Sequence, residues 1–78
     1  QRLPRMEMLA ELFYAEADTV SNPERDFLLE KAFALFGIIE REGKTYSLKR
    51  RWKMQDIQER ISNGQNGKTK TDENILQS

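Results

Sequence analysis

The sequence predicts a small α+β domain, mainly helical, in which two helices precede a β-hairpin and a third helix follows it. Two segments repeat apolar residues at helical spacing, and the segment after them changes to the alternating pattern of strands. The chain has 78 residues, so it holds one domain at most. A domain of this size buries only about 60% of its unfolded surface, which leaves little room for a deep substrate pocket.

The first predicted helix covers roughly residues 4–17. Apolar residues recur there at spacings of three and four and therefore share one helical face: Met6, Leu9, Leu12, Phe13 and Ala17. Pro4 suits the first turn of this helix, where a missing N–H costs nothing. We expect this face to pack against the rest of the domain.

The second predicted helix covers roughly residues 22–36 and has the broader apolar face. Ser21 and Glu24 have the spacing of a capping box, and Asn22 is the alternative cap. Gly37 is a plausible end for the helix. The apolar face is wide enough to contact more than one neighbour, with these members: Phe27, Leu28, Leu29, Ala32, Phe33, Leu35 and Phe36.

Residues 38–48 predict a β-hairpin with a turn at Glu42-Gly43. In that register Ile39 faces Tyr46, and both share one side with Leu48. This places Tyr46 against the helices. The competing interpretation is a helix through the same stretch, because Glu-Gly is a weak turn signal.

The third predicted helix covers roughly residues 51–62. Met54, Ile57 and Ile61 form a narrow apolar stripe, and Asn63-Gly64 is expected to end the helix. The composition from residue 64 onward is polar. We therefore predict one domain at 1–63 and a disordered tail at 64–78. The chain begins with Gln rather than Met, so we expect it to be part of a longer protein.

Charge is distributed unevenly along the chain, although the net charge is zero. Acidic residues dominate from Glu7 to Glu42, whereas residues 43–55 contain bases and no acid. Clustered cations are typical of phosphate binding. The sequence therefore predicts a nucleic-acid-binding edge with these cations: Lys44, Lys49, Arg50, Arg51 and Lys53. The alternatives are a solvated charge run and a nuclear-import signal.

Trp52 is the only tryptophan and lies within this basic run. It could stack on a base, and it belongs to the predicted nucleic-acid site in that interpretation. A tryptophan at the start of an apolar helical stripe is also typical of a core residue. Both interpretations stay open at this point.

Residues for catalysis or metal binding are scarce. The chain has no histidine and no cysteine, and its four glycines form no phosphate-binding loop. Glu7 and Glu11, like Asp26 and Glu30, are spaced for a solvated helical face. We therefore predict no catalytic residue, no metal site, no cofactor, no small-molecule substrate and no enzyme activity.

No membrane partner and no secretion are expected. No apolar run approaches the length of a membrane span, and the N-terminus lacks the apolar core of a signal peptide. The absence of cysteine is compatible with a reducing compartment. We expect an intracellular protein, cytoplasmic or nuclear.

The stretch "FLLEKAFALFGIIEREGKTYSLKRR", residues 27–51, resembles part of a winged-helix domain. Gly37-Ile38-Ile39 is similar to the family's helix end, and Tyr46-Ser47-Leu48 to the returning strand of its wing. The resemblance implies that residues 22–36 form the recognition helix and that the wing tip lies at residues 42–44. The family normally has three helices before the wing, so the resemblance implies either that a helix precedes Gln1 or that the linker at residues 19–22 replaces a short helix.

Two functions follow from these observations. The first is DNA or other nucleic-acid binding through the basic hairpin edge and the start of the third helix. The alternative is a protein–protein interaction module of a larger assembly. Acidic side chains on the predicted recognition helix favour the alternative, because they would lie among phosphates in a groove.

Overall fold

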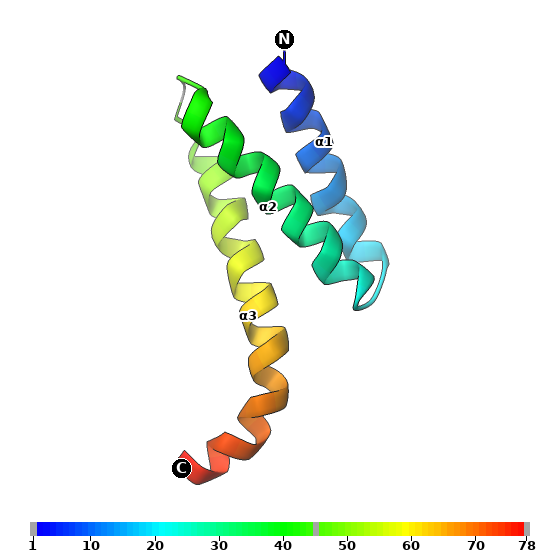
Figure 1. The fold of residues 1–78 in the computed structure, drawn as a ribbon, viewed down its shortest axis with the longest axis vertical. Coiled ribbons are helices and arrows are strands. Elements are labelled where there is room, and N and C mark those ends of the chain that lie inside the picture. The colour runs from blue at the N-terminus through cyan, green and yellow to red at the C-terminus, as the bar shows by residue number, and fades with distance from the viewer. Residues whose placement is uncertain (1, 45, 78) are drawn as a thin grey trace.

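The chain folds into a bundle of α-helices. In order, these are α1 (Arg2–Glu16), a 3-10 turn η1 (Ala17–Thr19), α2 (Glu24–Glu42) and α3 (Leu48–Gln77). The computed structural model describes the backbone of residues 2–44 and 46–77 and the side chains of residues 2–44 and 46–63. α2 runs back from the end of α1 to the start of α3, so α1 and α3 point in the same direction (Figure 1).

The core is built from small residues between α1 and α2 and from larger ones along α2. Ala10, Ala17 and Ala32 have no exposed surface, and their short side chains let the backbones approach closely. Leu29 and Phe36 are also completely buried. A buried side chain of this size contributes about 1.5–3 kcal/mol through the hydrophobic effect. α3 adds Ile57 to this cluster.

The predicted β-hairpin is wrong, and with it the α+β class and the winged-helix assignment. α2 continues through Gly37 to Glu42, and the described residues contain no strand. The physical reason is that Ile39 lies three residues after Phe36 and is buried with it in the same stripe. A hairpin would break this helical face. The helical interpretation of the stretch holds as far as Glu42.

A polar side chain accepts a hydrogen bond from a free backbone amide at the start of α2 and at the start of α3. Asn22 Oδ1 accepts a hydrogen bond from the Asp26 amide at 3.1 Å, so Asn22 rather than Ser21 is the side-chain acceptor before α2. Ser47 Oγ accepts one from the Arg50 amide at 3.1 Å. Because Ser47 has the position of an N-cap, α3 begins at Leu48, earlier than the sequence predicts.

α3 extends to Gln77 and is therefore longer at both ends than predicted. Its side chains from residue 64 onward lie outside those that the structure describes. The division into a domain at 1–63 and a tail at 64–78 stays a prediction.

Candidate interaction surface

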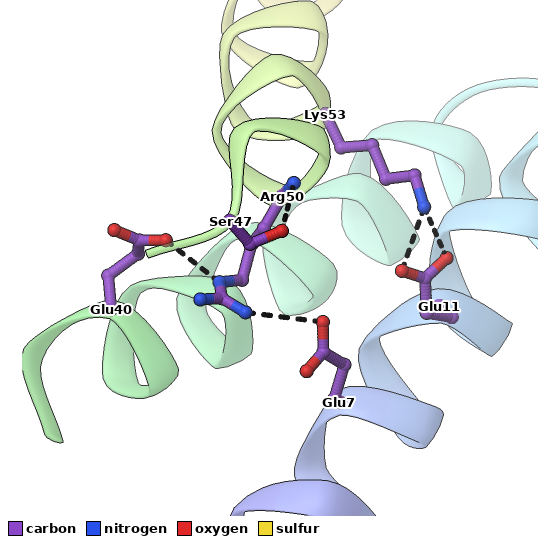
Figure 2. Close-up of polar contacts among 6 residues, drawn as sticks. All are labelled: Glu7, Glu11, Glu40, Ser47, Arg50 and Lys53. Carbon is purple, nitrogen blue, oxygen red and sulfur yellow. Dashed lines mark hydrogen bonds and ion pairs between the residues drawn. The ribbon is translucent and has the colours of Figure 1, made fainter. Parts of the chain in front are cut away.

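Arg50 lies at the centre of the three helices. Its side chain is only 6% exposed, and its Nε atom donates to Glu40 Oε2 of α2 at 2.8 Å. Its Nη1 atom lies 3.4 Å from Glu7 Oε2 of α1 (Figure 2). A buried guanidinium is tolerated because two carboxylates compensate its charge. Its burial places it away from any large ligand at the surface.

Lys53 also points toward α1. Its Nζ atom donates to both carboxylate oxygens of Glu11, at 2.7 Å and 2.8 Å (Figure 2). The side chain is 20% exposed. Lys53 therefore holds α3 against the acidic face of α1, and Arg50 holds α3 against both α1 and α2.

The remaining cations of the run are exposed. Arg51 has a side chain that is 57% exposed and lies 3.5 Å from Glu40 Oε1. Lys44 and Lys49 are exposed as well. The five cations thus divide into two that face the protein and three that face solvent. Arg50, in the middle of the run that the sequence predicts as a basic edge, is buried and paired with carboxylates of the bundle.

The contacts of Arg50 and Lys53 with α1 are the first half of a longer polar ladder. Further along, Tyr14 of α1 donates to Asp56 of α3, and Asp18 Oδ1 in η1, directly after α1, lies 3.0 Å from Arg60 Nη1 of α3. One turn along α1 matches one turn along α3 because the helices point the same way. The described parts of α1 and α3 make no close backbone contact, so long side chains span the gap. We call these four pairs the α1–α3 ladder: Glu7–Arg50, Glu11–Lys53, Tyr14–Asp56 and Asp18–Arg60.

Tyr14 is the ladder member with the most perturbed proton affinity. Burial, and then its hydrogen bond to Asp56, raise the pKa of Tyr14 to about 12. The Asp18 carboxylate accepts a hydrogen bond from Arg60 and raises the pKa of that guanidinium. Both shifts favour the protonated forms of Tyr14 and Arg60, which donate these hydrogen bonds.

Three large apolar side chains at the start of α3 face solvent. Tyr46 is 68% exposed, Leu48 71% and Trp52 63%. We call these residues the α3 patch. The expectation that Tyr46 packs against the helices is wrong, and so is the core interpretation of the two that the sequence leaves open for Trp52. The side of α3 that faces α2 is already occupied by Met54, Ile57 and Ile61, which lie at helical spacing.

The α3 patch borders a groove. The groove has a volume of about 880 Å³ and includes Phe33 of α2 and Met54 of α3 beside the patch residues. The Arg51 guanidinium lies on the same side, 5.8 Å from the centre of the Tyr46 ring. Neutral polar side chains line its other end: Gln55, Gln58, Ser62 and Asn63. The groove therefore combines an apolar, aromatic end with a cation.

Other apolar side chains are exposed on α1 and α2. Met8 is 72% exposed and Leu12 54%, one turn apart on α1. Phe27 is 59% exposed, with Lys31 Nζ 4.9 Å from its ring centre. The expectation that Phe27 is a core residue is wrong. Neither site combines two exposed aromatic rings, as the α3 patch does.

Neither a metal-binding group nor a membrane-spanning helix is found among the residues that the structure describes. No group of three or more acidic residues within the described part of the chain could hold a metal ion. Among the described residues, no helix has both the length and the apolar composition to cross a membrane. No protein-family model, no curated protein and no solved structure matches the chain.

Proposed function

We propose that this chain is a protein-interaction module that binds its partner through the α3 patch. The observation that carries the proposal is the exposure of Tyr46, Leu48 and Trp52, each more than half accessible and all at one end of α3. Aromatic residues in the centre of an interface supply most of its binding energy. A partner that covers these side chains removes their apolar surface from water.

The use of charge within the bundle supports the same proposal. Arg50 and Lys53 are engaged by carboxylates of α1 and α2, which lowers the number of cations available to phosphates. The α3 patch, in contrast, has no such role inside the described structure, because other residues of α3 face the core. Packing within the described fold therefore does not account for the large apolar side chains of the α3 patch.

Photocrosslinking tests this proposal. The photoreactive residue p-benzoylphenylalanine replaces Trp52 in one variant and Met8 of α1 in a matched control, since both positions are exposed. We expect discrete protein adducts from position 52 that disappear when Leu48→Ser and Tyr46→Ser are added. Equal adducts from both positions, or adducts that survive these two substitutions, would contradict a role for the α3 patch.

Nucleic-acid binding is a second proposal, favoured by the three exposed cations near the two aromatic rings. Lys44, Lys49 and Arg51 could contact phosphates while Tyr46 or Trp52 stacks on a base. If all three cations neutralise duplex phosphates, the dependence of log K on log salt has a slope of about −2.7. Titration of the chain with a random duplex at several salt concentrations measures this slope. Absence of binding at low salt would exclude this second function.

A further inference from the structure

The groove beside the α3 patch is electrostatically asymmetric. Arg51 lines the end that holds Tyr46 and Leu48, and the exposed side chains of Lys44 and Lys49 flank these residues in the chain. The only acid in its lining, Glu59, accepts a hydrogen bond from Gln55 at 3.5 Å. Gln58, Ser62 and Asn63, toward the other end, carry no charge. A ligand thus meets positive charge at one end and the Glu59 carboxylate among neutral polar side chains at the other.

The start of α3 strengthens this asymmetry. A helix N-terminus carries a partial positive charge that acidic side chains usually offset. The first turn of α3 has no acid, whereas that of α2 has Glu24 and Asp26. Lys49 and Arg51 add positive charge where the helix dipole is already positive. Glu40 of α2 contacts Arg50 and Arg51 and offsets part of this charge. An acidic group from outside the chain would offset the positive charge that remains at Lys49 and Arg51.

The length of the groove also limits its occupant. The lining residues on α3 run from Leu48 to Asn63. At a rise of about 1.5 Å per residue, this corresponds to about 22 Å, or about 15 residues of a second helix. Apolar anchors at successive turns of such a helix would meet Trp52, Met54 and Phe33, as in other helix-in-groove interactions.

We propose that the groove binds an amphipathic helix of a partner protein, with acidic side chains placed against Arg51 and Lys49. This inference rests on the proposed function, because it names the partner of the same surface. Apolar side chains of the partner helix cover the α3 patch, and its acidic residues set the direction in which it lies. Charge complementarity is the reason for choosing an acidic partner over a neutral or basic one.

Three synthetic peptides of about 15 residues, the length that the groove accommodates, test the inference on the full chain. They share one leucine stripe and differ only in the flanking residues, which are glutamate, glutamine or lysine. None contains tryptophan, so the fluorescence of Trp52, the only tryptophan of the chain, reports on binding directly. We expect the glutamate peptide to shift the Trp52 emission to shorter wavelength and to bind at least about tenfold more tightly than the lysine peptide.

Variants of the chain make this test specific. Arg51→Glu should reverse the order of the glutamate and lysine peptides, and Leu48→Ser should weaken all three. Met8→Ser on α1, which is equally exposed, is the control and should change nothing. Circular dichroism of each variant confirms that the helices are retained.

The outcomes separate the inference from the proposed function. Equal binding of all three peptides, or no reversal in Arg51→Glu, overturns the acidic partner, while the patch remains a protein-binding surface. A Trp52 shift that depends only on the concentration of the chain itself shows that a second copy occupies the groove, which also overturns the inference. If no peptide binds and the chain stays monomeric, the inference fails. The crosslinking at position 52 then decides the proposed function independently.

Discussion

The Nε atom of Arg50 lies 2.8 Å from Oε2 of Glu40, and this pair joins the last turns of α2 to the first turn of α3. The Arg50 side chain is 6% exposed and that of Glu40 18%. Since Glu7 approaches the same guanidinium from α1, one buried cation connects all three helices (Figure 2). The basic run in the sequence therefore has a structural role in its centre and an exposed aromatic surface beside it.

Neutralising Glu40 should destabilise the fold measurably. Glu40→Gln leaves Arg50 buried with less compensating charge, and we expect a loss of about 1.5–3 kcal/mol in the free energy of unfolding. Glu42→Gln is the matched control in the same helix, because the Glu42 pair with Arg2 is exposed and contributes about 0–1 kcal/mol. Urea unfolding followed by circular dichroism measures both variants. Equal losses in the two would show that Arg50 does not depend on Glu40.

Truncation of Ile57 in α3 should lower the stability of the fold strongly, whereas truncation of Trp52 should change it little. Trp52→Ser removes an exposed side chain, so we expect a change within about 0.5 kcal/mol. Ile57→Ala empties a site that is 1% exposed and should cost about 2–5 kcal/mol. Thermal unfolding followed by circular dichroism compares them without the tryptophan signal. A large loss in Trp52→Ser would place Trp52 in the core after all.

Substitutions at two glycines test whether the chain continues as a helix after residue 36 or turns into a hairpin. Gly37 lies inside α2, where an added Cβ would meet only Arg41 Nη1 at 3.9 Å, so Gly37→Ala should stabilise by about 0.5–1 kcal/mol. At Gly43 a Cβ would lie 2.7 Å from the Ile39 carbonyl oxygen, so Gly43→Ala should destabilise. Denaturant midpoints of the two variants give the signs. A destabilising Gly37→Ala would indicate that the helix ends there, as the hairpin requires.

Tyr14 should make stability depend on pH above about 10. Its pKa is raised from 10.0 to about 12 in the folded chain, so the unfolded chain loses this proton first. The stabilising contribution is complete below pH 10 and is lost as the pH rises toward 12. In Tyr46→Phe, which leaves Tyr14 as the only tyrosine, ultraviolet absorbance should show tyrosinate forming with a midpoint near 12.

Asp56→Asn provides the check on the cause of this shift. It removes the carboxylate that accepts the Tyr14 hydrogen bond, so the pKa of Tyr14 should fall toward its ordinary value. A midpoint that is the same with and without Asp56 would leave burial and the charge of Asp18 as the causes of the raised pKa.

Local patterns of the sequence were sufficient for the first two helices. The apolar spacing around Met6 and Phe13 and the wide face around Phe36 predict α1 and the first part of α2 correctly. The continuation of α2 was missed because Ile39 fits a strand with period two as well as a helix with period three or four. Its burial beside Phe36, a tertiary contact, decided between them.

The candidate interaction surface was likewise predicted only in part from the sequence, and tertiary contacts decided the rest. The sequence located the basic run and Trp52, and it predicted that the run lies along a hairpin edge and the start of the last helix. It did not pair Arg50 with Glu40, or Lys53 with Glu11, because partners about 10 and 42 residues apart leave no local signal. The regular spacing of Glu7 and Glu11 on one face was the available sign of a ladder, but it is equally typical of a solvated face.

The sequence by itself determined the positions of α1 and of the first part of α2, and that positive charge collects before and within α3, because spacing and composition are local properties. Only the tertiary structure decided which side of α3 faces the core. Met54, Ile57 and Ile61 occupy the space against α2, and carboxylates of α1 and α2 hold Arg50 and Lys53. These contacts set the rotation of α3 about its axis, and that rotation turns Leu48 and Trp52 toward solvent.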